Sequence, residues 1–110
     1  MVGSIIDGKQ HAINLRKRIK LATDNLISKY GITPGLAVVL VGNDPASEIY
    51  VRNKGIQTKE AGMESLEFRL PEDTSEEKLL KNVKELNKNQ SVNGILVQFP
   101  VPQHMSQQKI

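Results

Sequence analysis

The stretch GLAVVLVGNDPAS, residues 35–47, decides the fold of this chain. Leu36–Val41 is an unbroken apolar run rich in β-branched residues, which is typical of a strand covered on both faces in a parallel sheet. Asn43 or Asp44 can cap a following helix, and Pro45 suits the first turn of that helix. A buried strand that leads directly into a capped helix predicts an α/β layer.

A helix is predicted on each side of this strand. The helix that begins at Pro45 should reach about Ala61 and end at Gly62. The helix before the strand covers residues 9–29, and Gly31 follows it as a C-terminal stop. Its apolar residues recur at spacings of three and four, which predicts one apolar stripe: Ala12, Leu15, Ile19, Ala22 and Leu26.

Strands are predicted at three further places. SIIDG, residues 4–8, is typical of a short strand and turn. MESLEFRL, residues 63–70, alternates apolar and charged side chains and predicts a less buried strand. The last strand should cover Gly94–Phe99, because Pro100 and Pro102 then stop it.

The clearest helical pattern is PEDTSEEKLLKNVKELNKN, residues 71–89. Thr74 and Glu77 fit a capping box, and a buried stripe follows: Leu79, Leu80, Val83 and Leu86. The element order is then β-α-β-α-β-α-β. This order predicts an α/β fold of three layers with a mostly parallel sheet and right-handed crossovers. The tail HMSQQKI resembles the start of another helix, so we expect a single truncated domain.

Composition excludes several classes of protein. The 110 residues suit one domain, with 38% hydrophobic and 25% charged residues and no cysteine. His11 and His104 stand alone, so no metal site is expected. The net charge of +3 is spread along the helices without interleaved aromatic residues, which argues against a nucleic-acid partner. The absence of a signal-peptide pattern and of a long apolar run predicts a soluble cytoplasmic protein without a membrane partner.

Tyr50 and Lys54 are the first candidates for chemistry. They lie four residues apart, so they share one face of the predicted helix with Ser47, Val51 and Thr58. Lys54 can be an ordinary solvated lysine. It can also be a functional amine, because a lysine that is desolvated or placed near another cation can lose its proton and accept one or attack a carbonyl.

Gln98 is the second candidate, because it ends a strand that should be buried. Its amide must find hydrogen-bond partners there. Either neighbouring backbone supplies them, or Gln98 orients a catalytic side chain or a ligand. Pro100 and Pro102 also have two interpretations. They can simply end the strand, or they can form a rigid wall for a flat ligand. No G-x-G-x-x-G or G-x-x-x-x-G-K-[ST] phosphate loop occurs.

Several motifs together resemble a known family. IIDGK, PGLAVVLVGNDPASEIYVRNK, LPEDTSEEKLL and VNGILVQFPVP occur in this order. They resemble the N-terminal half of the bifunctional methylenetetrahydrofolate dehydrogenase/methenyltetrahydrofolate cyclohydrolase family. The Y-x-x-x-K motif combined with GILVQ-P-P is the most specific part of the match. Nearly the whole chain takes part in it.

The resemblance implies a folate site in a cleft between two α/β domains. Lys54 would correspond to the family's catalytic lysine, which acts in proton transfer during the cyclohydrolase step. Gln98 would hydrogen-bond that lysine, and Tyr50 would stack on the folate ring. The same pocket would be lined, partly through backbone atoms, by Val97, Phe99 and Pro100. Arg52 is the nearest candidate to attract an acidic glutamate tail of folate.

The resemblance also implies what the 110 residues do not contain. The parent enzyme would use NADP or NAD, bound by a C-terminal Rossmann domain that is absent here, and it would form a homodimer. The incomplete N-terminal folate-binding domain alone is then expected to be inactive as a dehydrogenase. Two alternatives stay open from the residues: a non-catalytic α/β interaction module, and an enzyme whose Lys54 forms a Schiff base.

Overall fold

The computed structural model describes residues 2–110, and its centre is the strand β1 (Gly35–Val41). β1 pairs in parallel with β2 (Glu64–Leu70) on one side and with β3 (Gly94–Val97) on the other. The sheet order is therefore β2-β1-β3. Both neighbours of β1 are parallel to it, so the predicted parallel α/β fold is confirmed.

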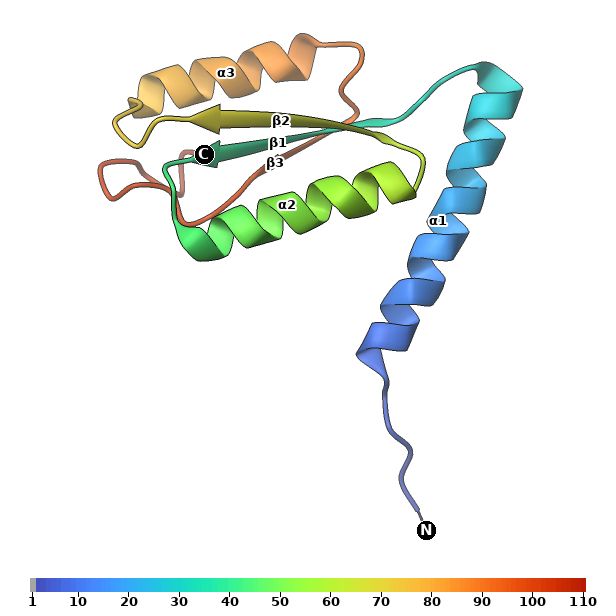
Figure 1. Ribbon diagram of the computed structural model, residues 1–110. Coiled ribbons are helices and arrows are strands. Elements are labelled where there is room, and N and C mark those ends of the chain that lie inside the picture. Colours follow the sequence, from blue (N-terminus) through green and yellow to red (C-terminus); the bar gives the residue numbers. More distant parts are fainter. Residues whose placement is uncertain (1) are drawn as a thin grey trace.

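Helices cover both faces of this sheet, as Figure 1 shows: α2 (Pro45–Glu60) lies on one face and α3 (Glu76–Lys88) on the other. The side chains of β1 alternate between two apolar clusters. Those at odd positions pack with Leu79 of α3, and those at even positions pack with Val51 of α2. Residues 37–41 are all between 0% and 3% exposed. The continuous apolar run is thus explained by burial on two sides.

Short polar residues and glycines set the ends of the helices. The Asp44 side chain caps α2, and Gly62, with a φ of 83°, follows the end of that helix. Both match the prediction. The cap of α3 is Ser75, whose side chain accepts a hydrogen bond from the backbone amide of Lys78. The predicted cap, Thr74, is wrong, because Thr74 is buried in the preceding turn, where its amide bonds back to Pro71.

The predicted first strand at residues 4–8 is wrong. Residues 2–7 have no regular structure, and α1 begins at Gly8. Ile5 and Ile6 are 94% and 86% exposed. A strand forms only where its backbone groups find partners in a neighbouring strand, and within the described residues the sheet contains β1, β2 and β3 alone. The order in residues 2–110 is α-β-α-β-α-β.

The end of the chain also differs from the prediction. β3 ends at Val97, two residues before the predicted Phe99. The Gln98 amide still bonds to the Val39 carbonyl at 2.9 Å, but Pro100 has no amide hydrogen to continue the ladder. Residues 101–110 form turns instead of the expected helix, and Met105 packs into the α3 cluster.

The first helix, α1 (Gly8–Tyr30), forms as predicted but packs differently. Gly31, with a φ of 66°, ends it. Thr23 is the one buried residue of this fully described helix, whereas Leu15 and Leu26 of the apolar stripe are 50% and 40% exposed. Figure 1 shows α1 extending away from the sheet. Its stripe therefore does not contribute to either core.

Within residues 2–110, no helix combines the length and the apolar character that a membrane crossing requires.

Substitution of Gly35 by alanine should test the packing of β1. A Cβ at Gly35 would lie 2.1 Å from the backbone oxygen of Ser91, which cannot move without shifting the chain. We expect Gly35→Ala to lower the free energy of unfolding by about 1–3 kcal/mol, measured by urea denaturation. Gly8→Ala is the matched control, because no atom lies within 4 Å of its added Cβ. Equal stabilities of the two variants would contradict the packing described for β1.

Candidate functional site

The structure brings Lys54 and Gln98 together. Lys54 lies in the middle of α2, and Gln98 follows β3 at the carboxyl edge of the sheet. The Lys54 Nζ donates a hydrogen bond to the Gln98 Oε1 at 2.6 Å. Both side chains are half-buried. Two segments that are 44 residues apart thus meet through the two side chains that the sequence singles out.

Gln98 is held so that its amide oxygen faces the lysine. Its backbone amide bonds to Val39 of the central strand, and its side-chain Nε2 donates to the Phe99 carbonyl at 3.0 Å. The Oε1 is then the acceptor for Lys54. The side chain of Gln98 therefore has partners of both expected kinds. The neighbouring Phe99 backbone accepts from its amide nitrogen, and its amide oxygen accepts from the Lys54 side chain.

The start of α2 is fixed by a partly buried capping network. The Asp44 Oδ2 accepts hydrogen bonds from both the amide and the hydroxyl of Ser47, at 3.1 and 2.8 Å. Ser47 is only 1% exposed, and its Oγ lies 3.5 Å from the Phe99 carbonyl. This network places the first turn of α2 against the segment that carries Gln98. Sequence reasoning placed Ser47 on the right face but assigned it no role.

Thr58 is another residue whose role the sequence left unassigned. Its hydroxyl donates to the Lys54 carbonyl at 2.6 Å, and the residue is 6% exposed. A back-bond of this kind adds a second donor to one helix carbonyl. The backbone under Lys54 is therefore anchored on its C-terminal side, as the cap anchors α2 at its start.

One exposed aromatic residue lies beside the lysine, and a second follows Gln98 in the chain. The ring centroid of Tyr50 lies 5.8 Å from the Lys54 Nζ, within the range of a cation–π contact. Tyr50 is 59% exposed, and Phe99, which follows Gln98, is 42% exposed. An exposed aromatic ring beside a half-buried amine is suited to a flat ligand that stacks and also hydrogen-bonds.

The remaining predicted site residues lie around this centre with different orientations. Val97 packs with the cluster that contains Leu79 of α3, on the face of the sheet opposite α2. It can face the Lys54 side only through its backbone. Pro100 is exposed and lines a cavity of about 680 Å³ at the carboxyl edge, together with Pro102 and Asp44.

The turn between β1 and α2 does not suit a phosphate. In dinucleotide-binding folds, backbone amides at this turn face the pyrophosphate. Here the Asp44 carboxylate already accepts from the Ser47 amide, and Pro45 contributes no amide hydrogen. The turn therefore offers a negative charge where a dinucleotide would need a donor.

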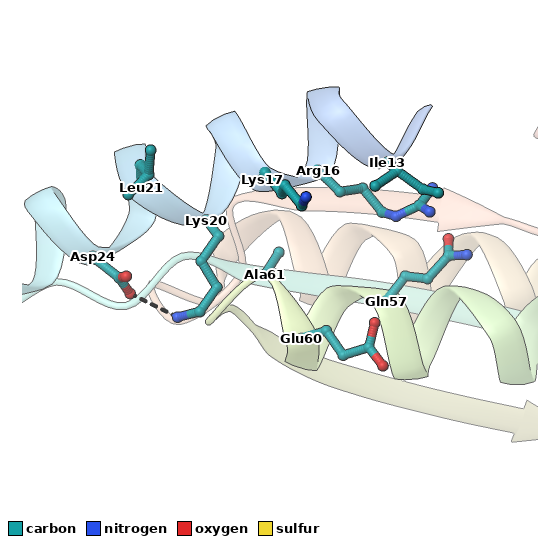
Figure 2. A pocket seen from close by; sticks show the side chains of 9 residues that line it. All are labelled: Ile13, Arg16, Lys17, Lys20, Leu21, Asp24, Gln57, Glu60 and Ala61. Atoms are coloured by element: carbon teal, nitrogen blue, oxygen red, sulfur yellow. Dashed lines mark hydrogen bonds and ion pairs between the residues drawn. The ribbon is translucent and has the colours of Figure 1, made fainter. Parts of the chain in front are cut away.

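The described residues do not form a metal site. Within residues 2–110, no group of three or more His, Cys, Asp and Glu side chains could hold a metal ion. The His104 Nε2 instead donates to the Thr74 carbonyl at 2.7 Å. A cavity of about 710 Å³ lies between α1 and the C-terminal end of α2 (Figure 2), and none of Tyr50, Lys54 and Gln98 is among its lining residues.

Comparison with known proteins adds a consistent set of matches. The chain matches the family model described as "Tetrahydrofolate dehydrogenase/cyclohydrolase, catalytic domain" over residues 6–110. It is 59% identical over 110 residues to a curated relative, the "Bifunctional protein FolD" of Parvibaculum lavamentivorans. The match covers the entire chain but 37% of that relative, so the chain spans little more than a third of the relative's length.

Solved structures match in the same way. The bifunctional enzyme FolD of Campylobacter jejuni aligns with a TM-score of 0.91 at 40% identity, over 94% of this chain and 36% of that one. The Trypanosoma brucei methylenetetrahydrofolate dehydrogenase-cyclohydrolase, solved with NADP cofactor and inhibitor, aligns with a TM-score of 0.89 at 30% identity. That alignment covers 94% of this chain and 35% of the trypanosomal one.

The capping network generates a stability prediction. Asp44→Ala removes the acceptor of the Ser47 amide and leaves the buried Ser47 hydroxyl without its nearest partner. We expect the free energy of unfolding to fall by about 1–2 kcal/mol, measured by urea denaturation. Asp7→Ala removes the equivalent cap of α1, a helix that packs little, and should cost less. A larger loss for Asp7→Ala would contradict this ranking.

Proposed function

This chain belongs to the tetrahydrofolate dehydrogenase/cyclohydrolase family, and we propose that its Tyr50, Lys54 and Gln98 form the folate site. The observation that carries the proposal is the 2.6 Å hydrogen bond between the Lys54 Nζ and the Gln98 Oε1. It joins the two motifs on which the family resemblance rests. The whole enzyme would oxidise methylenetetrahydrofolate to the methenyl form and hydrolyse that product to formyltetrahydrofolate.

Lys54 is proposed to move the proton in the hydrolysis. Water adds through its oxygen to the methenyl carbon and loses one proton, which leaves a hydroxyl on that carbon. One carbon–nitrogen bond of the five-membered ring then breaks as that nitrogen gains a proton, and the remaining hydroxyl proton leaves to water as the formyl C=O forms. An unprotonated Lys54 amine can take the first proton and return it to the nitrogen. Gln98 holds the amine through an uncharged acceptor, and no ion pair of Lys54 is formed among residues 2–110.

The aromatic side chains are proposed to bind the folate ring system. Tyr50 lies beside the Lys54 amine, Phe99 follows Gln98 directly, and both aromatic residues are exposed. A stacked pterin would place its polar edge within reach of the lysine and the amide. Pro100 supplies a rigid neighbouring surface, and Val97 contributes through its backbone.

The dehydrogenase step needs a hydride acceptor, which NADP or NAD supplies when bound. The trypanosomal relative is named as a complex with NADP. A further solved structure, from Saccharomyces cerevisiae, aligns with a TM-score of 0.73 at 25% identity and is named as NAD-dependent. The turn after β1 does not fit a dinucleotide phosphate, because the Asp44 carboxylate and Pro45 occupy it. We therefore propose that the cofactor site lies outside residues 1–110, in a second domain. The relatives are long enough to contain such a domain, because this chain covers 37% of the Parvibaculum protein.

The other partners inferred from the sequence stay predictions. These are a homodimeric parent enzyme, a cytoplasmic location, and the lack of nucleic-acid and membrane partners.

The role of Lys54 can be tested in a full-length chimera. Residues 1–110 replace the matching 110 residues of the Parvibaculum relative, and methenyltetrahydrofolate hydrolysis is followed by absorbance. Lys54→Ala should lower the cyclohydrolase rate at least about 100-fold, since a positioned acid–base group contributes at least that much. Lys59→Ala is the matched control, because Lys59 lies on the same helix but lines a groove toward β2. Unchanged hydrolysis by a folded Lys54→Ala chimera would refute the role.

The placement of the cofactor site gives a second test. The 110-residue chain alone, mixed with methylenetetrahydrofolate and NADP, should produce no NADPH absorbance above background, whereas the full-length chimera should produce it. Turnover by the chain alone would overturn the proposal that the cofactor site lies outside residues 1–110.

A further inference from the structure

Beyond Gln98 the chain leaves the sheet. The Gln98 amide still bonds to the Val39 carbonyl at 2.9 Å, and Pro100 then contributes no amide hydrogen to the ladder. Residues 99–106 nevertheless matter to the site, because the Phe99 carbonyl accepts from the Gln98 Nε2 at 3.0 Å. The direction of the Gln98 side chain therefore depends on where this segment is held.

The start of α3 holds the segment at two points. The His104 Nε2 donates to the Thr74 carbonyl at 2.7 Å, and the Ser106 backbone amide donates to the Glu76 carboxylate. Each of these bonds joins residues that are 30 positions apart in the chain. Thr74 and Glu76 flank Ser75, which caps α3, so both bonds reach the same helix end.

α3 is a firm support for these bonds, because it is anchored in the core. Its Leu79 and Leu86 are 0% and 5% exposed in the cluster that packs on β1. The segment adds Val101 and Met105 to the same cluster, and both are nearly buried. The Met105 amide also bonds to the Pro102 carbonyl at 3.0 Å and closes a turn. Apolar packing and hydrogen bonds therefore fix the turn to α3 together.

Glu76 differs from an ordinary acid in a first helical turn. The helix dipole alone favours carboxylates there, and it accounts for Glu77, which is exposed. The Glu76 side chain is only 24% exposed and accepts from the Ser106 amide, with the Lys109 Nζ at 3.9 Å. A carboxylate that is largely covered and bonded to a distant backbone amide holds two segments together.

We propose that Glu76 and His104 are positioning residues for Gln98. The inference rests on the proposed folate site and adds two residues that act on it from the other face of the sheet, where Figure 1 shows α3. By tying the segment to α3, they fix the Phe99 carbonyl. That carbonyl holds the Gln98 Nε2 and leaves the Oε1 for the Lys54 amine. Neither residue is proposed to touch the folate.

The first test uses the 110-residue chain and the NMR signals of the Gln98 side-chain amide. Glu76→Ala and His104→Ala should each shift these signals, because the Phe99 carbonyl that accepts from the amide is no longer held. Unmoved Gln98 signals in both variants would overturn the proposal. Circular dichroism checks the fold. His104→Ala changes no helical residue, so it carries the test if Glu76→Ala does not fold.

Matched controls separate position from charge. Glu77→Ala removes the neighbouring acid of the same turn, and His11→Ala removes the other histidine, which is exposed on α1. Both should leave the Gln98 signals in place. Glu76→Gln keeps an oxygen that can accept from the Ser106 amide, so it should also preserve them. A Glu76→Gln variant that behaves like Glu76→Ala would refute the assigned hydrogen bond.

The second test follows methenyltetrahydrofolate hydrolysis in the full-length chimera. We expect Glu76→Ala and His104→Ala to lower kcat roughly tenfold, because a displacement of about 1 Å can cost up to about 100-fold. KM should change less, since neither residue touches the folate. In a Gln98→Ala background the same substitutions should cost little more, because they act through Gln98. Fully additive losses would show an effect independent of Gln98 and refute the proposal.

The outcomes separate this inference from the folate site. If Gln98→Ala slows hydrolysis while Glu76→Ala and His104→Ala do not, the folate site stands and the positioning role is overturned. If Gln98→Ala leaves hydrolysis unchanged, the catalytic part of Gln98 in the proposed site fails. The NMR signals of Gln98 then decide alone whether Glu76 and His104 hold its side chain.

Discussion

Burial of β1 on both faces is the constraint on which the rest of this structure depends. Its last five residues are at most 3% exposed, and their side chains alternate between α3 on one face and α2 on the other. A strand in this position needs hydrogen-bonding partners on both edges, and β2 and β3 supply them in parallel. The apolar run of β1 therefore positions the helices α2 and α3 and the flanking strands β2 and β3. Because all three strands point the same way, their carboxyl ends meet at one edge, where the polar residues of the site gather.

The site at that edge is held in place by hydrogen bonds to the backbone around Lys54 and Gln98, and it is not enclosed by the rest of residues 2–110. Lys54 reaches Gln98 because the Asp44–Ser47 network fixes the start of α2, the Thr58 hydroxyl holds the backbone after the lysine, and the ladder bond to Val39 fixes Gln98. The aromatic rings beside the pair remain open to solvent. Such a surface binds a flat ligand by stacking and hydrogen bonding on one side. A full enclosure would need further polypeptide on the other side, and the matched relatives are longer than this chain.

α1 has a different relation to the fold. It is well formed and capped at both ends, yet it adds little to either core, and its apolar stripe is half-exposed. A cavity of about 710 Å³, lined by Arg16, Lys17 and Lys20 among others, lies between α1 and the C-terminal end of α2 instead of a filled interface.

Much of the fold follows from local pattern. The run Leu36–Val41 predicts a doubly covered strand, the spacing of Tyr50 and Lys54 puts them on one helix face, and Gly31 and Gly62 stop two helices where only glycine takes a positive φ readily. Residues 4–8 were mistaken for a strand because an apolar pair predicts extended backbone but not a pairing partner. The choice of Ser75 over Thr74 as a cap depended on a turn that the tertiary contacts set. Apart from the strand predicted at residues 4–8, the sequence by itself therefore determined the elements from α1 to β3 and their order, and it singled out Lys54 and Gln98 as candidates for chemistry. Only the tertiary structure decided that Lys54 meets Gln98 and that the Val97 side chain faces away from α2, because contacts between distant segments depend on how whole elements pack.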